Sequence, residues 1–179
     1  MCAKKISPTR RSRTVTWQDP MITVKAISAM NGIDFLRAMR DGKVSPPILS
    51  LVGFRLAEVD SGRVVFEINP AEYHYNPAGT VHGGVTFTVL DSAATFAVHS
   101  TLQAGMALTT LEVKVNYLRP IVSETGIMRC EGSLIHKGSR TAVAEAKMLD
   151  TKGLLYAYAV STCLIFEAVK HGTKTGNEC

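Results

Sequence analysis

Two adjacent glycines and a single acid are the residues of this chain whose types and spacing best suit chemistry. Gly83 and Gly84 follow His82 and open an apolar segment that runs to Leu102, in which Asp91 is the only acidic residue. Backbone N–H groups at the start of a helix lack partners within the helix and favour a developing negative charge. An isolated carboxylate in apolar sequence is costly to bury and therefore needs a role. An amide donor and an isolated acid together predict hydrolysis of an activated acyl group.

Each of these two groups has a chemical interpretation and a structural alternative. Gly83 is predicted to donate the N–H that binds the oxyanion, because a glycine lets a carbonyl group approach the helix start. The alternative is that both glycines only permit tight packing of a helix on a sheet. Asp91 is predicted to act as a general base on water or as a nucleophile, and the sequence does not separate the two. A purely structural acid is disfavoured, because aspartate is a poor residue for a helix interior.

The spacing of Gly83 and Asp91 predicts an assembly. Eight residues along one helix correspond to a rise of about 12 Å, whereas reacting atoms must approach within about 3–3.5 Å. One helix therefore cannot bring both groups to the same carbonyl. If both roles are right, the site combines the helix start of one subunit with Asp91 of another, and a monomer is inactive.

Composition is that of one ordinary globular domain. The chain has 179 residues, of which 46% are hydrophobic and 20% charged, with a formal net charge of +5. The first thirteen residues contain a group of basic residues and no acid. This segment is interpreted as a solvated basic arm, and nucleic-acid binding is disfavoured because the charge elsewhere is nearly balanced. The basic residues of the arm are Lys4, Lys5, Arg10, Arg11 and Arg13.

The cysteines and histidines indicate no metal site. Cys130 and Cys163 lie in apolar, strand-like runs, where a free thiol behaves as a small core side chain. The histidines show no zinc-ligand spacing with acids or cysteines, so no metal is expected. A reducing compartment is expected, and with no signal-peptide pattern or long charge-free apolar run we expect a cytoplasmic protein that does not enter a membrane.

The surrounding segments predict an antiparallel sheet wrapped around one helix. Residues 21–39 have helical spacing interrupted at Asn31-Gly32, which predicts two short helices, and Pro46-Pro47 is expected to start extended chain. The segment 85–102 is apolar nearly all round, which predicts a helix surrounded by protein. Patterns of period two predict strands at 51–59, 64–69, 110–117, 127–136, 141–149 and 154–166.

Side-chain types refine this α+β arrangement. Small residues on the helix, such as Ala93 and Ala97, and alanines on the last two strands predict a close approach of helix and sheet. In the strand 110–117, strict alternation predicts one buried face and one outward, polar face that includes Thr110. The residues of the buried face are Leu111, Val113, Val115 and Tyr117.

Four segments carry a family resemblance: residues 76–84, 90–93, 110–120 and 137–140. A His-Gly-Gly sequence has Asn76 six residues before its histidine and Asp91 eight residues after its first glycine, and a Tyr-Leu-Arg-Pro sequence follows. With these residues the chain resembles the hotdog-fold acyl-CoA thioesterases, specifically the phenylacetic-acid-degradation (PaaI-type) branch, over about residues 51–166. The resemblance implies a hotdog fold and thioester hydrolysis without metal or redox cofactor. Coenzyme A is part of the substrate and is not counted as a cofactor. It also implies a homodimer with interfacial active sites, often paired into a homotetramer.

The resemblance also implies roles for further residues. His82 is expected to orient the substrate carbonyl or to hold its loop by hydrogen bonding, and Asn76 to hold the lytic water or the same loop. Thr110 corresponds to a strand hydroxyl that assists the acid, although a polar strand residue facing solvent is nearly as good an interpretation. Coenzyme A needs partners for its phosphates. The candidates are the cations Arg119, Lys137 and Arg140, with Gly84, Gly138 and Ser139.

The sequence therefore predicts four parts and one activity. They are a flexible basic arm (1–20), a short helical region (21–47), a hotdog thioesterase domain (48–168) and a flexible tail (169–179). The predicted reaction is hydrolysis of an aryl- or medium-chain acyl-CoA to the free acid and coenzyme A. The alternatives are a non-catalytic acyl-CoA-binding or regulatory hotdog protein and a hotdog acyl-thioester hydratase. A single acid with an amide donor favours hydrolysis over both.

Overall fold

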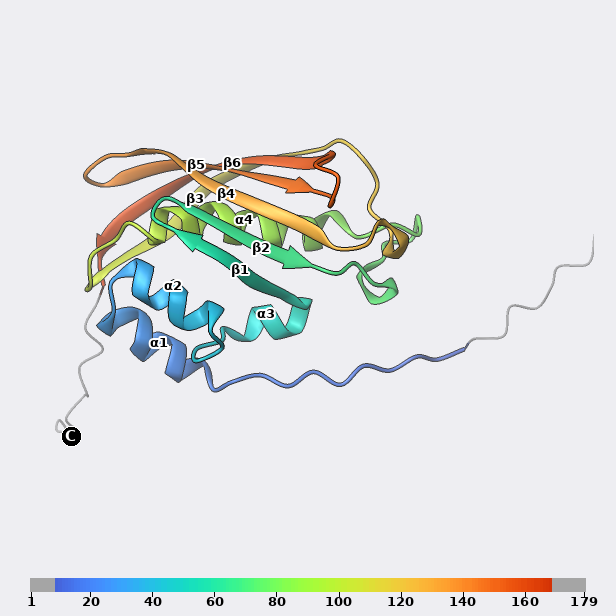
Figure 1. The fold of residues 1–179 in the computed structure, drawn as a ribbon, viewed down its shortest axis with the longest axis horizontal. Helices are drawn as coiled ribbons and strands as arrows, with labels where there is room; N and C mark the ends of the chain where they lie inside the picture. Colours follow the sequence, from blue (N-terminus) through green and yellow to red (C-terminus); the bar gives the residue numbers. More distant parts are fainter. Residues whose placement is uncertain (1–8, 169–179) are drawn as a thin grey trace, which may run out of the picture.

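One antiparallel sheet curves around a central helix, α4 (Gly83–His99), in the computed structural model, which describes residues 9–168 (Figure 1). The strand order is β1-β2-β4-β5-β6-β3, so β1 and β3 are the two edges. The predicted α+β architecture is confirmed. The strands are β1 (Phe54–Asp60), β2 (Arg63–Ile68), β3 (Met106–Tyr117), β4 (Met128–Lys137), β5 (Thr141–Leu149) and β6 (Leu155–Glu167).

The helix lies against the sheet because small residues line both sides of the contact. Ala93, Ala94 and Ala97 of α4 are fully buried, as are the alanines of β5 that face them. Gly132 of β4 shows how close the approach is, since a Cβ atom there would lie 2.0 Å from the carbonyl oxygen of Ala93. The predicted close approach is confirmed, and so is the burial of the thiols of Cys130 and Cys163.

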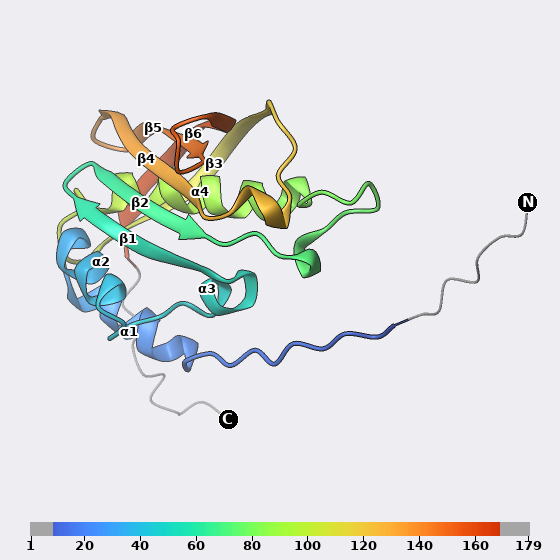
Figure 2. The same cartoon turned by 45° about the vertical axis from the view of Figure 1, so that its right-hand side comes forward.

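Three helices precede the sheet: the second packs on β1 and α4, the third on β1, and the first on the second (Figure 2). They are α1 (Pro20–Ala29), α2 (Gly32–Arg40) and α3 (Pro47–Val52). The predicted break at Asn31-Gly32 is confirmed, and it lies where α2 meets α4. A Cβ atom on Gly32 would lie 1.6 Å from the carbonyl oxygen of His99, so this contact requires glycine. None of the helices within residues 9–168 is long and apolar enough to cross a membrane.

The expectation of extended chain from Pro46-Pro47 is wrong, because α3 begins at Pro47. Proline is tolerated at the first helical position, since its missing N–H would have no partner there. The first strand accordingly starts at Phe54 rather than at residue 51. Gly53, with φ of 86°, ends the helix in the left-handed conformation that glycine adopts readily.

Side chains from two distant segments complete the end of α3. The guanidinium group of Arg13 donates to the carbonyl oxygens of Ser50 (2.8 Å) and Leu51 (3.2 Å). The Nε2 atom of His74 forms a hydrogen bond with the carbonyl oxygen of Val52 (2.8 Å). These three bonds satisfy carbonyls that a helix end leaves without partners.

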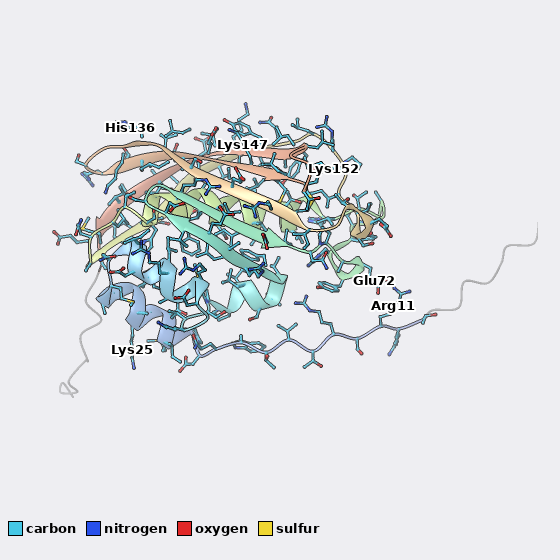
Figure 3. The ribbon with its side chains drawn as sticks, in the orientation of Figure 1. Arg11, Lys25, Glu72, His136, Lys147 and Lys152 are labelled. Carbon is cyan, nitrogen blue, oxygen red and sulfur yellow. The ribbon has the colours of Figure 1, made fainter. Side chains whose placement is uncertain are left out.

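The segment ahead of α1 runs alongside α3 in Figures 1 and 2. In this segment the guanidinium group of Arg13 stacks on the ring of Tyr73, 4.2 Å from the ring centroid. Arg11 forms an ion pair with Glu72 (Figure 3). Lys4, Lys5 and the predicted tail 169–179 lie outside the described residues.

Candidate active site

The start of α4 presents one free backbone donor. His82 caps the helix: its Nδ1 atom accepts from the N–H of Gly84 (2.9 Å), and its carbonyl oxygen accepts from that of Val85 (2.9 Å). The N–H of Gly83 has no hydrogen-bond acceptor within residues 9–168. A free N–H at the positive end of a helix of 17 residues suits a negatively charged oxygen.

The cap also defines the state of the His82 ring. Because Nδ1 accepts a hydrogen bond, the proton of the neutral imidazole lies on Nε2. The roles expected for His82 were to orient the substrate carbonyl or to hold its loop, and the Nδ1 bond, which caps α4 at Gly84, tests neither of them.

A cavity of about 350 Å³ opens beside Gly83. Residues from four segments line it: the loop before α4, the start of α4, the end of β3 with the chain that follows it, and Ala157 of β6. Neither Asp91 nor Thr110 belongs to its lining. The lining includes Asn76, Gly83, Thr86, Tyr117, Arg119 and Ile121.

Asn76 holds the loop that leads to the helix. Its Oδ1 atom accepts from the N–H groups of Ala78 (2.8 Å) and Thr80 (3.3 Å), and its Nδ2 atom donates to Thr80 Oγ1 (3.0 Å). The N–H of His82 donates to the carbonyl of His74 (2.8 Å), which joins the loop to the preceding turn. Of the two roles expected for Asn76, the structure therefore shows the loop contact.

Asp91 and Thr110 meet in the middle of α4. The hydroxyl of Thr110 donates to Asp91 Oδ1 (3.0 Å), and that of Thr95 lies 3.3 Å from the same atom. The prediction that α4 is surrounded on all sides is wrong, because Gly84, Phe87 and Asp91 lie along a face that the chain leaves open. Asp91 is only partly buried, since it faces this open side rather than the sheet.

The expected alternation of β3 fails at one residue. The register with β6 shifts between Thr110 and Glu112, which leaves Leu111 as a bulge that is 58% exposed. The prediction that Leu111 is buried, and Thr110 turned outward, is therefore wrong, and Tyr117, assigned to the same buried face, is 53% exposed. A bulge inserts one residue and changes which positions face the helix. Val113 packs against the core as predicted.

The cationic candidates lie at opposite ends of the molecule. Arg119 borders the cavity at Gly83 and donates to the carbonyl of Leu155. Lys137 donates to the carbonyl of Thr101 (2.8 Å), beyond the far end of α4, which its 17 residues place about 25 Å from the helix start. In the same hairpin the N–H of Gly138 is occupied by the carbonyl of Thr141 (2.8 Å), while Ser139 and Arg140 are exposed.

Tyr117 is a site residue that sequence reasoning missed. Its hydroxyl donates to the carbonyl oxygen of Gly83 (2.9 Å), and its ring lies 3.2 Å from where a Cβ atom of Gly83 would be. Burial raises the pKa of Tyr117, so the hydroxyl keeps its proton at neutral pH. The sequence signal was the position of Tyr117 directly before Leu118-Arg119-Pro120, but alternation assigned it only to the core.

Comparisons with known proteins show the family of this chain. The model of the thioesterase superfamily matches residues 78–157, from the loop before α4 into β6. A protein of Halobacterium salinarum, provisionally named as an esterase, is 31% identical over 107 residues, which cover 57% of this chain and 69% of the relative. The 1,4-dihydroxy-2-naphthoyl-CoA hydrolase of Listeria monocytogenes is 29% identical over 124 residues, which cover 69% of this chain and 95% of the relative.

A solved structure supports the same assignment. A phenylacetic acid degradation-related protein of Ralstonia eutropha has a TM-score of 0.65 and 26% identity, and the match covers 72% of this chain and 98% of that one. The chain belongs to the thioesterase superfamily and has its hotdog fold. It is a thioester hydrolase, as the resemblance implied.

Proposed function

We propose that this enzyme hydrolyses aryl- or medium-chain acyl-CoA thioesters to the free acid and coenzyme A. One observation carries the proposal: the free N–H of Gly83 borders a cavity, and Asp91, held by Thr110, faces an open side of the same helix. The naphthoyl-CoA named as the substrate of the Listeria relative supports an aryl acyl group. We place the reaction in the cytoplasm, where buried thiols stay reduced.

The proposed chemistry divides between these two groups. The N–H of Gly83 binds the carbonyl oxygen and stabilises the negative charge that grows on it, an effect of about 3–4 kcal/mol for one such donor. Asp91 either removes a proton from the attacking water or attacks the carbonyl carbon itself. The hydroxyl of Thr110 orients its carboxylate, and the hydroxyl of Thr95, which donates to the backbone carbonyl of Asp91, lies 3.3 Å from the same carboxylate oxygen. Coenzyme A leaves as the thiol.

The active site requires two subunits. Gly83 and Asp91 are about 12 Å apart along α4. In each active site, Gly83 of one subunit must therefore act together with Asp91 of a second subunit. The free edge of β3 offers a way to pair, because two such edges related by a two-fold axis join antiparallel and extend the sheet. The two α4 helices then run antiparallel beside each other.

This arrangement places the symmetry axis at one residue. If Gly83 of one helix lies opposite Asp91 of the other, the midpoint is Phe87, which lies on the open face and is 37% exposed. The same symmetry brings the hairpin of Lys137 in one subunit toward the loop of Asn76 in the other. The cations at the two ends of a single chain then belong to one coenzyme A site.

The first test is thiol release from a panel of aryl- and fatty-acyl-CoA esters. We expect wild type to release thiol and Asp91→Asn, which keeps the side-chain shape, to lose turnover while remaining folded. Binding of esters without release by wild type would refute the proposal and support a non-catalytic acyl-CoA binder. Light scattering gives the mass of the assembly, and we expect the mass of a dimer or a tetramer. The mass of a monomer would contradict the shared site.

A mixing experiment tests the shared site directly. Gly83→Pro removes the donor and Asp91→Asn removes the acid, so each variant alone is inactive. In a mixed dimer one site receives the intact Gly83 of one subunit and the intact Asp91 of the other. Random pairing on coexpression makes about half the dimers mixed, which restores about a quarter of the wild-type sites. No recovery on mixing would refute a site that combines Gly83 of one subunit with Asp91 of the other.

A further inference from the structure

Two peptide units meet at Gly83, and three of their four polar groups have partners. In the first unit the carbonyl of His82 accepts from the N–H of Val85. In the second, the N–H of Gly84 donates to His82 Nδ1, and the carbonyl of Gly83 accepts from the Tyr117 hydroxyl as well as from the N–H of Phe87 one helical turn on. The one group left is the N–H of Gly83. Its direction is therefore set by the bonds that hold the other three.

Only one of these partners comes from outside the start of α4. His82 and Val85 belong to the cap itself, whereas Tyr117 lies at the end of β3, 34 residues further along the chain. Glycine is conformationally permissive, so the bonds of the first helical turn restrain Gly83 less than they would a residue with a side chain. The hydroxyl of Tyr117 fixes the second peptide unit from across the cavity, and its ring covers the side of Gly83 that lacks a Cβ atom.

The same strand supports the acid. Thr110 donates to Asp91 from β3, and Tyr117 donates to Gly83 from the end of the same strand. Both halves of the proposed chemistry are therefore oriented by hydroxyls from one edge strand.

We propose that Tyr117 is a positioning residue of thioester hydrolysis, whose hydroxyl bond to the Gly83 carbonyl aims the Gly83 N–H at the substrate oxygen. The inference rests on the proposed function. Tyr117 acts through Gly83 and not by contact with the reacting atoms. A tyrosine that only lined the cavity would contribute to substrate binding through its ring, and its hydroxyl would be dispensable.

The variant Tyr117→Phe separates these roles, because it removes the hydroxyl and keeps the ring. We expect kcat for an acyl-CoA ester to fall three- to tenfold while KM stays within twofold. The matched control is Tyr158→Phe, on the outer side of the neighbouring strand β6, for which we expect wild-type kinetics. A Tyr117→Phe enzyme with wild-type kcat, or with a change in KM alone, would overturn the proposal.

A spectroscopic measurement tests the aim of the N–H without turnover. In the Asp91→Asn background a bound acyl-CoA persists, and the infrared stretch of its labelled thioester carbonyl shifts downward when an N–H donates to it. We expect a smaller shift when Tyr117→Phe is added and no change when Tyr158→Phe is added. An equal shift in all three proteins would refute the positioning role.

The two proposals fail in different ways. If the proposed function is wrong, wild type releases no thiol from any ester. If only the role of Tyr117 is wrong, wild type hydrolyses an ester and Tyr117→Phe does so equally well.

Discussion

Replacing Gly83 by proline deletes a single N–H from the site with little disturbance of the backbone. Proline is well tolerated at the first position of a helix, which Gly83 occupies in α4. The residue before a proline must be extended, and His82 already has φ of −60° and ψ of 135°. The helix can therefore start unchanged while its one free donor is gone.

The expected effect follows from the role of that donor. Loss of one oxyanion-binding N–H costs about 100- to 1,000-fold in kcat, or about 3–4 kcal/mol. Proline also adds a Cβ atom, which would lie 3.2 Å from the Tyr117 ring. Gly83→Ala adds the same atom and keeps the N–H, so it is the matched control. We expect the alanine variant to stay within about tenfold of wild type, because the tyrosine ring has to shift by only a few tenths of an ångström.

Thiol release from one acyl-CoA ester gives kcat for both variants, and thermal melting and light scattering verify that fold and assembly persist. The ratio of the alanine and proline variants removes the effect of the added Cβ atom, which both carry, and reports the loss of the N–H together with the two further ring carbons of proline. Equal activity of the two would refute Gly83 as the oxyanion donor. The neighbouring N–H of Gly84 offers no substitute while it is bound to His82.

Three further outcomes test the packing, the assembly and the acid response. Gly132→Ala should abolish cooperative thermal unfolding, because its Cβ atom would lie 2.0 Å from the Ala93 carbonyl oxygen and no rotamer change relieves a backbone clash; a wild-type melting curve would contradict the helix–sheet contact. Phe87→Arg should give an inactive monomer by light scattering with Asp91 intact, and an active dimer would exclude the proposed axis. Burial lowers the pKa of His99 to about 4, so below pH 6.5 the unfolded chain binds a proton that the native protein does not. Stability should therefore fall by about 2 kcal/mol from pH 7 to pH 5 in urea titrations, and an equal fall in His99→Phe would show that another group is responsible.

Where periodicity was regular, the sequence was enough to predict the fold. The strand expected at 141–149 forms over those residues, and the small residues of α4 and β5 meet as expected. The bulge at Leu111 gave no such signal, because apolar and polar residues alternate in the sequence without a break over residues 110–117. Helix α3 was missed because its end depends on Arg13 and His74, which are distant in sequence.

The site was predictable in its residue types and less so in its contacts. The free N–H of Gly83 follows from its position at a helix start, and the partnership of Thr110 with Asp91 was expected only through the family resemblance. The loop contacts of Asn76 and the hydroxyl bond of Tyr117 depend on tertiary geometry that no local pattern encodes. Asp91 was expected to be buried because hydropathy does not distinguish a face covered by the same chain from one left open.

The bulge in β3 has a consequence for how this sequence can change in length. Before the bulge the even-numbered Thr110 faces α4, and after it the odd-numbered Val113 and Tyr117 do. Deleting Leu111 would restore strict alternation and leave Thr110, Val113 and Tyr117 all facing α4, because Leu111 is the residue without a partner in β6. Substitution at Leu111 should also be mild, because its side chain is mostly exposed. Position 111 is thus tolerant in both length and identity, whereas losing a second residue from this stretch of β3 would turn the side chains on one side of the deletion to the opposite face.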